Sequence, residues 1–73
     1  MYRYPIIIEK AGENYSAYCP DLPGCVATGK TIRDTSLQAK KAIRFHLAGM
    51  KKEGIPLPIP SSKIGYVTIS IPA

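Results

Sequence analysis

The sequence predicts a small α+β domain with two layers, built in the order β-β-β-α-β. Three observations support this prediction. Residues 2–28 contain short β-like runs separated by glycine and proline. A long amphipathic stretch follows, with apolar residues spaced by three and four. Strict apolar alternation then returns at residues 66–71, which is typical of one more strand.

The first three strands are expected at residues 2–9, 14–19 and 25–28. The first of these places alternate residues on one face, namely Tyr2, Tyr4, Ile6 and Ile8. Pro5 cannot donate to a sheet ladder, so it should lie near the start of the strand or on an unpaired edge. Gly12 marks the turn that leads into the second strand. These strands should form an antiparallel meander.

The helix is expected to begin at Thr31 and to run to about Glu53. Thr31 and Asp34 have the spacing of a capping box, and Asp34 also suits the positive first turn of a helix. Gly54 should end the helix, with proline just beyond it. Its apolar stripe should pack on one face of the sheet and comprises Ile32, Thr35, Ala39, Ala42, Ile43, His46, Leu47 and Met50.

A proline at every second position of residues 55–60 favours a stiff, extended connector whose aliphatic residues cover the sheet edge. It leads to the fourth strand, in which Val67, Ile69 and Ile71 should point inward. A right-handed crossover would return this strand to the sheet. The sheet face opposite the helix should then meet solvent or a partner.

The length of 73 residues indicates one domain, residues 1–73. A domain this small often gains stability from a partner subunit, so we expect an oligomer or a complex. No run approaches the ~20 apolar residues of a membrane helix, and no secretory signal is visible, so we expect a cytoplasmic protein without a membrane partner. Cys19 and Cys25 should then be reduced and buried, with a disulfide as the alternative.

The chain offers little for catalysis or metal binding. Two cysteines and one histidine, His46, are too few for a zinc site. The five carboxylates, Glu9, Glu13, Asp21, Asp34 and Glu53, are mostly explained by turns and caps, which leaves no set for a two-metal nuclease. His46 has no evident acid partner. We therefore expect no enzyme activity, no metal and no cofactor.

The segment Pro20-Asp21-Leu22-Pro23-Gly24-Cys25 follows a strand that carries an aromatic residue near its end. A short strand, Gly29, Thr31 and the amphipathic helix come next, and the helix closes with Lys-Glu-Gly-Ile-Pro-Leu-Pro. In this order, over nearly the whole chain, the sequence resembles the HicB family of antitoxins.

The resemblance implies a truncated RNase H-like sheet with one helix. It also implies a protein that binds and neutralises a small mRNA-cleaving toxin of the HicA type by direct contact, and a homo-oligomer, either a dimer or a tetramer. Many members add a C-terminal DNA-binding module. Because this chain stops at Ala73, just after the expected fourth strand, we expect the minimal form without that module.

The rigid loop after the second strand is our candidate surface for a protein partner. Its residues are Asp21, Leu22, Pro23 and Gly24. A loop with two prolines loses little entropy on binding, so it suits the presentation of Leu22 and Pro23. The Asp21 carboxylate should also accept a neighbouring backbone N–H in a local turn, and the two roles are compatible.

A basic helix face supports an alternative function, nucleic-acid binding. The net charge is +5, and one face carries Arg33, Lys40, Arg44 and Lys51, flanked by Lys41 and Lys52. No acidic residue alternates along it, so the usual helix ion pairs are missing. The face is either a solvated outer surface or a contact for phosphates. Because the helix of such antitoxins is commonly acidic, these cations weaken the electrostatic case for toxin binding through this face.

Overall fold

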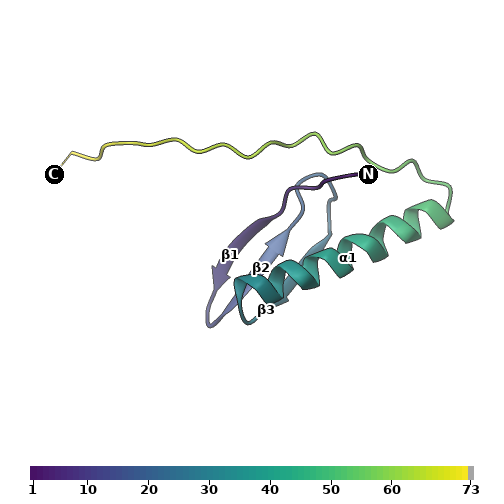
Figure 1. The fold of residues 1–73 in the computed structure, drawn as a ribbon, viewed down its shortest axis with the longest axis horizontal. Helices are drawn as coiled ribbons and strands as arrows, with labels where there is room; N and C mark the ends of the chain where they lie inside the picture. The colour runs from purple at the N-terminus through teal and green to yellow at the C-terminus, as the bar shows by residue number, and fades with distance from the viewer. Residues whose placement is uncertain (73) are drawn as a thin grey trace.

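The computed structural model describes residues 1–72. Its elements are β1 (Ile7–Ala11), β2 (Asn14–Tyr18), β3 (Val26–Gly29) and α1 (Ile32–Lys52). The strands form one antiparallel sheet in the order β1-β2-β3, and α1 crosses one face of it (Figure 1). The predicted α+β fold, with one helix packed on one face of a sheet, is confirmed. Ala73, where the predicted domain ends, lies outside the described residues.

Small residues let α1 approach the sheet closely. Ala17 of β2 pairs with Ile8 on one side and Ala27 on the other, and Ala17 is only 2% exposed. Gly29 shows the closest approach, because a Cβ atom there would lie 2.7 Å from the backbone nitrogen of Thr35. Such a distance is impossible without a shift of the helix. Glycine at this position therefore fixes how closely the start of α1 sits on β3.

The hydrophobic core lies between α1 and the loop that follows β2. Its buried centre is formed by Cys19, Leu22 and Cys25. Five half-buried side chains pack around this centre: Tyr4, Ile6, Ala42, Ile43 and Leu47. The apolar stripe predicted for the helix therefore faces the core at its middle positions.

Both ends of α1 follow the predicted capping chemistry. The Asp34 backbone N–H donates to the Thr31 hydroxyl at 2.9 Å, which satisfies one free donor of the first turn. The Asp34 carboxylate in turn accepts from the backbone N–H of Lys30 at 3.2 Å. In a standard capping box the donor would be the N-cap residue, Thr31, which is one position later. At the other end Gly54 has φ +73°, and the N–H of Ile55 donates to the carbonyl of Met50 at 2.9 Å. This is the Schellman arrangement that ends many helices.

The first strand begins later than the sequence predicts, at Ile7 rather than at residue 2. Ile7 pairs with Tyr18, the last residue of β2, so the residues before Ile7 have no partner strand in β2. Pro5 lies in this unpaired stretch, where its missing N–H costs nothing. Residues 1–6 instead run beside α1 (Figure 1).

The predicted fourth strand at residues 66–71 is not formed. Beyond the helix the chain is extended without sheet pairing, and it runs past the sheet and away from the body (Figure 1). Residues 61–72 are all exposed. A strand pattern alone does not make a strand, because each strand needs a neighbour to pair its backbone groups. We call residues 55–62 the connector and residues 63–72 the C-terminal segment.

Candidate interaction surfaces

The loop after β2 does not present Leu22 as the sequence suggested. Leu22 is 1% exposed and belongs to the core. Its N–H donates to the carbonyl of Cys19 at 3.1 Å, and its carbonyl accepts from the N–H of Cys25 at 3.1 Å. This tight turn folds the side chain inward. Of the four predicted partner-binding residues, Pro23 and Gly24 remain exposed at the tip.

Asp21 ties the loop to the connector rather than to its own neighbours. One carboxylate oxygen, Oδ1, accepts from the backbone N–H and the hydroxyl of both Ser61 and Ser62, at 3.0–3.3 Å. Burial alone would raise the pKa of Asp21, but these four hydrogen bonds outweigh it and hold the pKa below its usual 3.8. The expected local turn is therefore corrected to a long-range anchor. No local pattern in the sequence indicated this contact.

The basic residues of α1 divide between the two sides of the helix. All the predicted cations are exposed, namely Arg33, Lys40, Lys41, Arg44 and Lys51. Lys40 and Arg44 border a groove beside the N-terminal segment, whereas Lys41 borders a groove beside β3. Lys41, which flanks the predicted stripe, therefore borders a different groove from Lys40 and Arg44 of the stripe itself.

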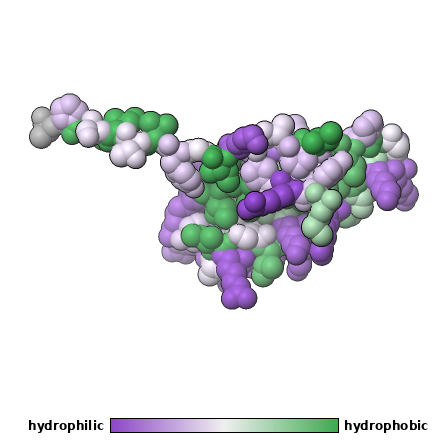
Figure 2. All heavy atoms as spheres, turned by 45° about the horizontal axis from the view of Figure 1, so that its top comes forward, coloured by the Kyte–Doolittle hydropathy of each residue, from purple (hydrophilic) through white to green (hydrophobic). Residues whose placement is uncertain are grey.

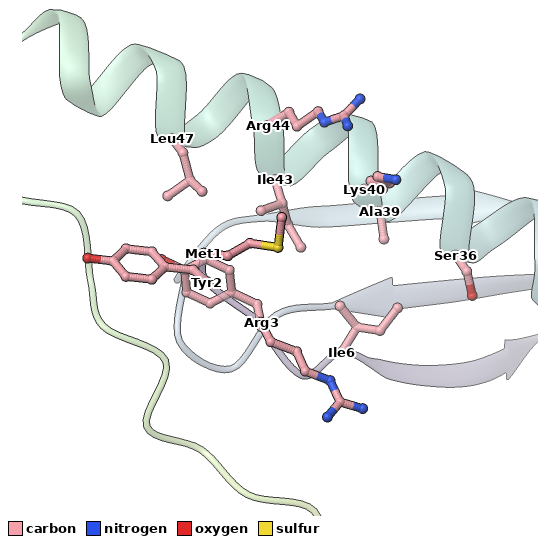
Figure 3. A pocket seen from close by; sticks show the side chains of 11 residues that line it. Met1, Tyr2, Arg3, Ile6, Ser36, Ala39, Lys40, Ile43, Arg44 and Leu47 are labelled. Atoms are coloured by element: carbon pink, nitrogen blue, oxygen red, sulfur yellow. The ribbon is translucent and has the colours of Figure 1, made fainter.

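We call the first of these the β1 groove, because it lies between α1 and the chain that enters β1. Its volume is about 690 Å³. Ala39, Ile43 and Leu47 point into it from the helix, and Ile6 faces them from the sheet side (Figure 3). Arg3 joins Lys40 and Arg44 on its border. The groove thus combines an apolar floor with a basic margin. Arg3 was not among the basic residues predicted to bind a partner.

The second groove, of about 420 Å³, we call the β3 groove, because β3 forms one of its walls. Val26 from β3 and Phe45 from α1 line it, and they are 67% and 84% exposed. Within residues 1–72, β3 has a neighbour on one side only, so its outer edge offers unpaired backbone groups here. Phe45 was not among the site residues predicted from the sequence. The available signal was an aromatic residue on the charged side of an amphipathic helix, four positions after Lys41.

The two cysteines are buried free thiols, as the sequence predicted. Burial raises the pKa of the Cys25 thiol, and the neighbouring Cys19 raises it further. Within the part of the chain that the structure describes, no three His, Cys, Asp or Glu residues gather closely enough to hold a metal ion. In residues 1–72, α1 is not apolar enough to cross a lipid bilayer.

Comparison with known proteins identifies the family. The family described as HicB_like antitoxin of bacterial toxin-antitoxin system matches residues 4–70. This range includes the whole sheet, the helix, the connector and most of the C-terminal segment. The chain belongs to the HicB-like antitoxin family. The resemblance seen in the sequence is thereby confirmed.

Relatives of this HicB-like chain occur in a phage and in an archaeon. An uncharacterized 14.9 kDa protein of Haemophilus phage HP1 is 46% identical over 55 residues, which are 75% of this chain and 41% of the phage protein. A UPF0150 protein of Thermoplasma acidophilum is 35% identical over 57 residues, covering 77% of this chain and 83% of that protein. The chain therefore spans less than half the length of the phage relative.

Two solved structures share the fold of this HicB-like chain. A chain of the HicA3 and HicB3 toxin-antitoxin complex is 40% identical, with a TM-score of 0.70, and the match covers 82% of this chain and 70% of that one. The N-terminal domain of the Burkholderia pseudomallei antitoxin HicB is 30% identical, with a TM-score of 0.74, and the match covers 82% and 72%. The agreement extends over most of each chain.

Proposed function

We propose that this HicB-like chain is an antitoxin that binds and neutralises a small mRNA-cleaving toxin of the HicA type. Family membership and the likeness to a chain of a HicA3–HicB3 complex support this function. The location of the binding site is inferred from Phe45. This large apolar side chain is 84% exposed and lies beside the free edge of β3. Exposed aromatic residues next to a groove are frequent anchors of protein interfaces.

The β3 groove suits a protein partner for three reasons. Phe45 and Val26 offer apolar surface, which gains most when a partner removes it from water. The outer edge of β3 offers backbone donors and acceptors that an extended partner segment could pair. Neither feature depends on charge, so a chain of net charge +5 can bind a basic toxin here without electrostatic attraction.

Truncation of Phe45 tests this surface. We expect Phe45→Ala to weaken toxin binding at least about tenfold, as for a moderate hot-spot residue. The measurement is calorimetric titration with a purified HicA-type toxin. Tyr2→Ala is the matched control, because Tyr2 is an exposed aromatic residue of the β1 groove. If the Tyr2 variant loses affinity and the Phe45 variant does not, the toxin binds the other side of the helix. Absence of any complex would refute the function.

The alternative function, nucleic-acid binding, gains one observation from the structure. Arg3 lines the β1 groove together with Lys40 and Arg44, so cations of two separate segments border it. If phosphates bind at this border, RNA affinity should fall steeply with salt. The double variant Lys40→Glu/Arg44→Glu should abolish it. The control Lys41→Glu/Lys52→Glu makes the same change of charge outside this groove and should retain most of the affinity. Undetectable RNA binding at low salt would exclude this alternative.

A further inference from the structure

The loop between β2 and β3 is a double turn whose two ends carry the cysteines. The N–H of Leu22 donates to the carbonyl of Cys19 at 3.1 Å, and the N–H of Cys25 donates to the carbonyl of Leu22 at 3.1 Å. Each of these hydrogen bonds joins a residue to the third one before it, which is the spacing of a β-turn. Pro20 and Pro23 hold the second position of the two turns, where the fixed φ of proline is suitable. The loop is therefore a rigid link between the two cysteines.

The two cysteines also stand opposite each other in the register of the sheet. The ladder between β2 and β3 ends with the pair of Tyr18 and Val26. One step further in the same register brings Cys19 opposite Cys25, and the N–H of Cys19 donates to the carbonyl of Cys25 at 3.2 Å. Directly opposite residues of antiparallel strands have their Cα atoms about 4.5–5.5 Å apart and their side chains on one face. This separation lies within the roughly 4.4–6.8 Å that a disulfide spans between Cα atoms.

Both thiols lie in the same part of the core. Cys19 and Cys25 belong to one buried cluster with Leu22 and are 3% and 6% exposed. Burial raises the pKa of the Cys25 thiol, and the nearby Cys19 raises it further, which agrees with side chains that point the same way. Two cysteines that the backbone already holds opposite each other can form a bond without a large movement of the strands.

We propose that Cys19 and Cys25 are a redox modification site, at which glutathione disulfide converts the two thiols into an internal disulfide that closes residues 19–25 into a ring. In the first step the thiolate of one cysteine attacks a sulfur of glutathione disulfide, and one glutathione leaves as its thiolate. In the second step the thiolate of the other cysteine attacks the protein sulfur of this mixed disulfide and displaces the second glutathione. The protein loses two electrons and two protons, and glutathione disulfide is reduced to two glutathione molecules.

Closure of this ring stabilises the anchor of the connector. Asp21 lies within the ring, and its carboxylate accepts the hydrogen bonds from Ser61 and Ser62. Beyond these serines the hydrophobic C-terminal segment projects from the body (Figure 2). A disulfide restricts the open conformations of a loop more than the closed one, so the oxidised protein should hold this anchor more firmly. Phe45 lies outside the ring, so the proposal does not depend on toxin binding.

Mass spectrometry of the intact chain tests the pairing. The protein is held in glutathione buffers with an increasing share of glutathione disulfide, until the products no longer change, because the buried thiols react slowly. It is then unfolded in the presence of iodoacetamide, which modifies every free thiol. We expect the main product to be a single chain that has lost two hydrogen atoms and carries neither glutathione nor the iodoacetamide label.

The matched control is Cys25→Ser/Val26→Cys. It moves the second thiol by one residue to the opposite face of the sheet, where Val26 is 67% exposed. This variant should carry bound glutathione in place of an internal disulfide. Bound glutathione on the native chain, disulfide-linked pairs of native chains, or native cysteines that stay free in the most oxidising buffer would overturn the proposal.

Urea unfolding shows whether the ring fits the fold. We expect the oxidised native chain to unfold at a higher urea concentration than the reduced chain, and its Ser61 and Ser62 amides to exchange more slowly. Cys25→Ala cannot form the bond and should unfold at the same urea concentration in both buffers. An oxidised native chain that unfolds at an equal or lower urea concentration would show that the bond strains the double turn, and would contradict the proposal.

Discussion

In the central strand β2 and in the C-terminal segment, the quality of the sequence pattern and the presence of strand pairing are reversed. β2 has poor alternation, with Tyr15 and Tyr18 on opposite faces, yet it pairs with β1 along its whole length and with β3 from Tyr15 to Tyr18. The C-terminal segment has the cleaner pattern and pairs with nothing in residues 63–72. Alternation shows which faces a strand could offer, but a neighbouring edge decides whether the strand forms. Within residues 1–72, the molecule thus divides into a body whose strands pair with one another and a C-terminal segment that pairs with no strand.

The largest expected difference between these regions concerns stability. Leu22→Ala should lower the free energy of unfolding by about 2–5 kcal/mol, because it leaves a cavity in the core. Ile64→Ala removes a similar side chain from the C-terminal segment, where Ile64 is 59% exposed. That change should stay within about 0.5 kcal/mol. Urea denaturation of both variants measures the difference, and similar losses would show that the segment belongs to the body.

A second pair of variants tests how closely α1 sits on the body. Gly29→Ala forces a Cβ atom to within 2.7 Å of the Thr35 backbone, so we expect a loss of about 1–3 kcal/mol. Gly49→Ala lies on α1 where nothing comes within 4 Å of an added Cβ, so it should stabilise the protein by about 0.5–1 kcal/mol. Thermal unfolding compares the two. If both substitutions changed the stability in the same direction, the close contact between β3 and α1 would be contradicted.

The anchor of the connector should depend on pH. Because the folded-state pKa of Asp21 is lowered, its charged form is favoured in the fold. The contribution of the charged Asp21 to folding stability is fully present above the usual carboxyl pKa. It is lost as the pH falls through the lower pKa of the folded state. We expect Asp21→Ala to release the anchor at neutral pH, seen as faster amide exchange at Ser61 and Ser62. Amides of β2 serve as the internal control and should not change.

The smallest expected effect leaves the fold untouched and concerns thiol reactivity. Cys25 is 6% exposed and its pKa is raised, so its nucleophilic thiolate is scarce at neutral pH. Both native thiols should react slowly with Ellman's reagent. A cysteine introduced in the exposed segment by Lys63→Cys should react at the rate of a free thiol. Fast reaction of Cys25 in the native chain would indicate that the body opens readily.

Local chemistry made most of the body predictable from the sequence. The cap at Thr31, the stop at Gly54 and the turn at Gly12 each depend on neighbouring residues, and each lies where the sequence placed it. The start of β1 was misplaced, because strand ends are set by the partner strand and not by the strand itself. The fourth strand failed for the same reason.

The surfaces were harder to predict than the fold. Leu22 looked exposed because it lies in a proline-rich loop, but a tight turn folds it into the core. The contact of Asp21 with Ser61 and Ser62 joins residues 40 and 41 positions apart, beyond the reach of local patterns. Phe45 became a candidate only when the structure placed it beside Val26 and the free edge of β3.

The central claim is that the body binds a HicA-type toxin through the apolar β3 groove rather than through its positive charge. Calorimetric titration of the intact chain with the toxin, at about 50 and 200 mM salt, tests it most directly. We predict a complex whose Kd changes less than about tenfold over this range, since apolar burial and backbone pairing are weakly screened. The absence of a complex, or a Kd that rises by orders of magnitude with salt, would contradict the claim.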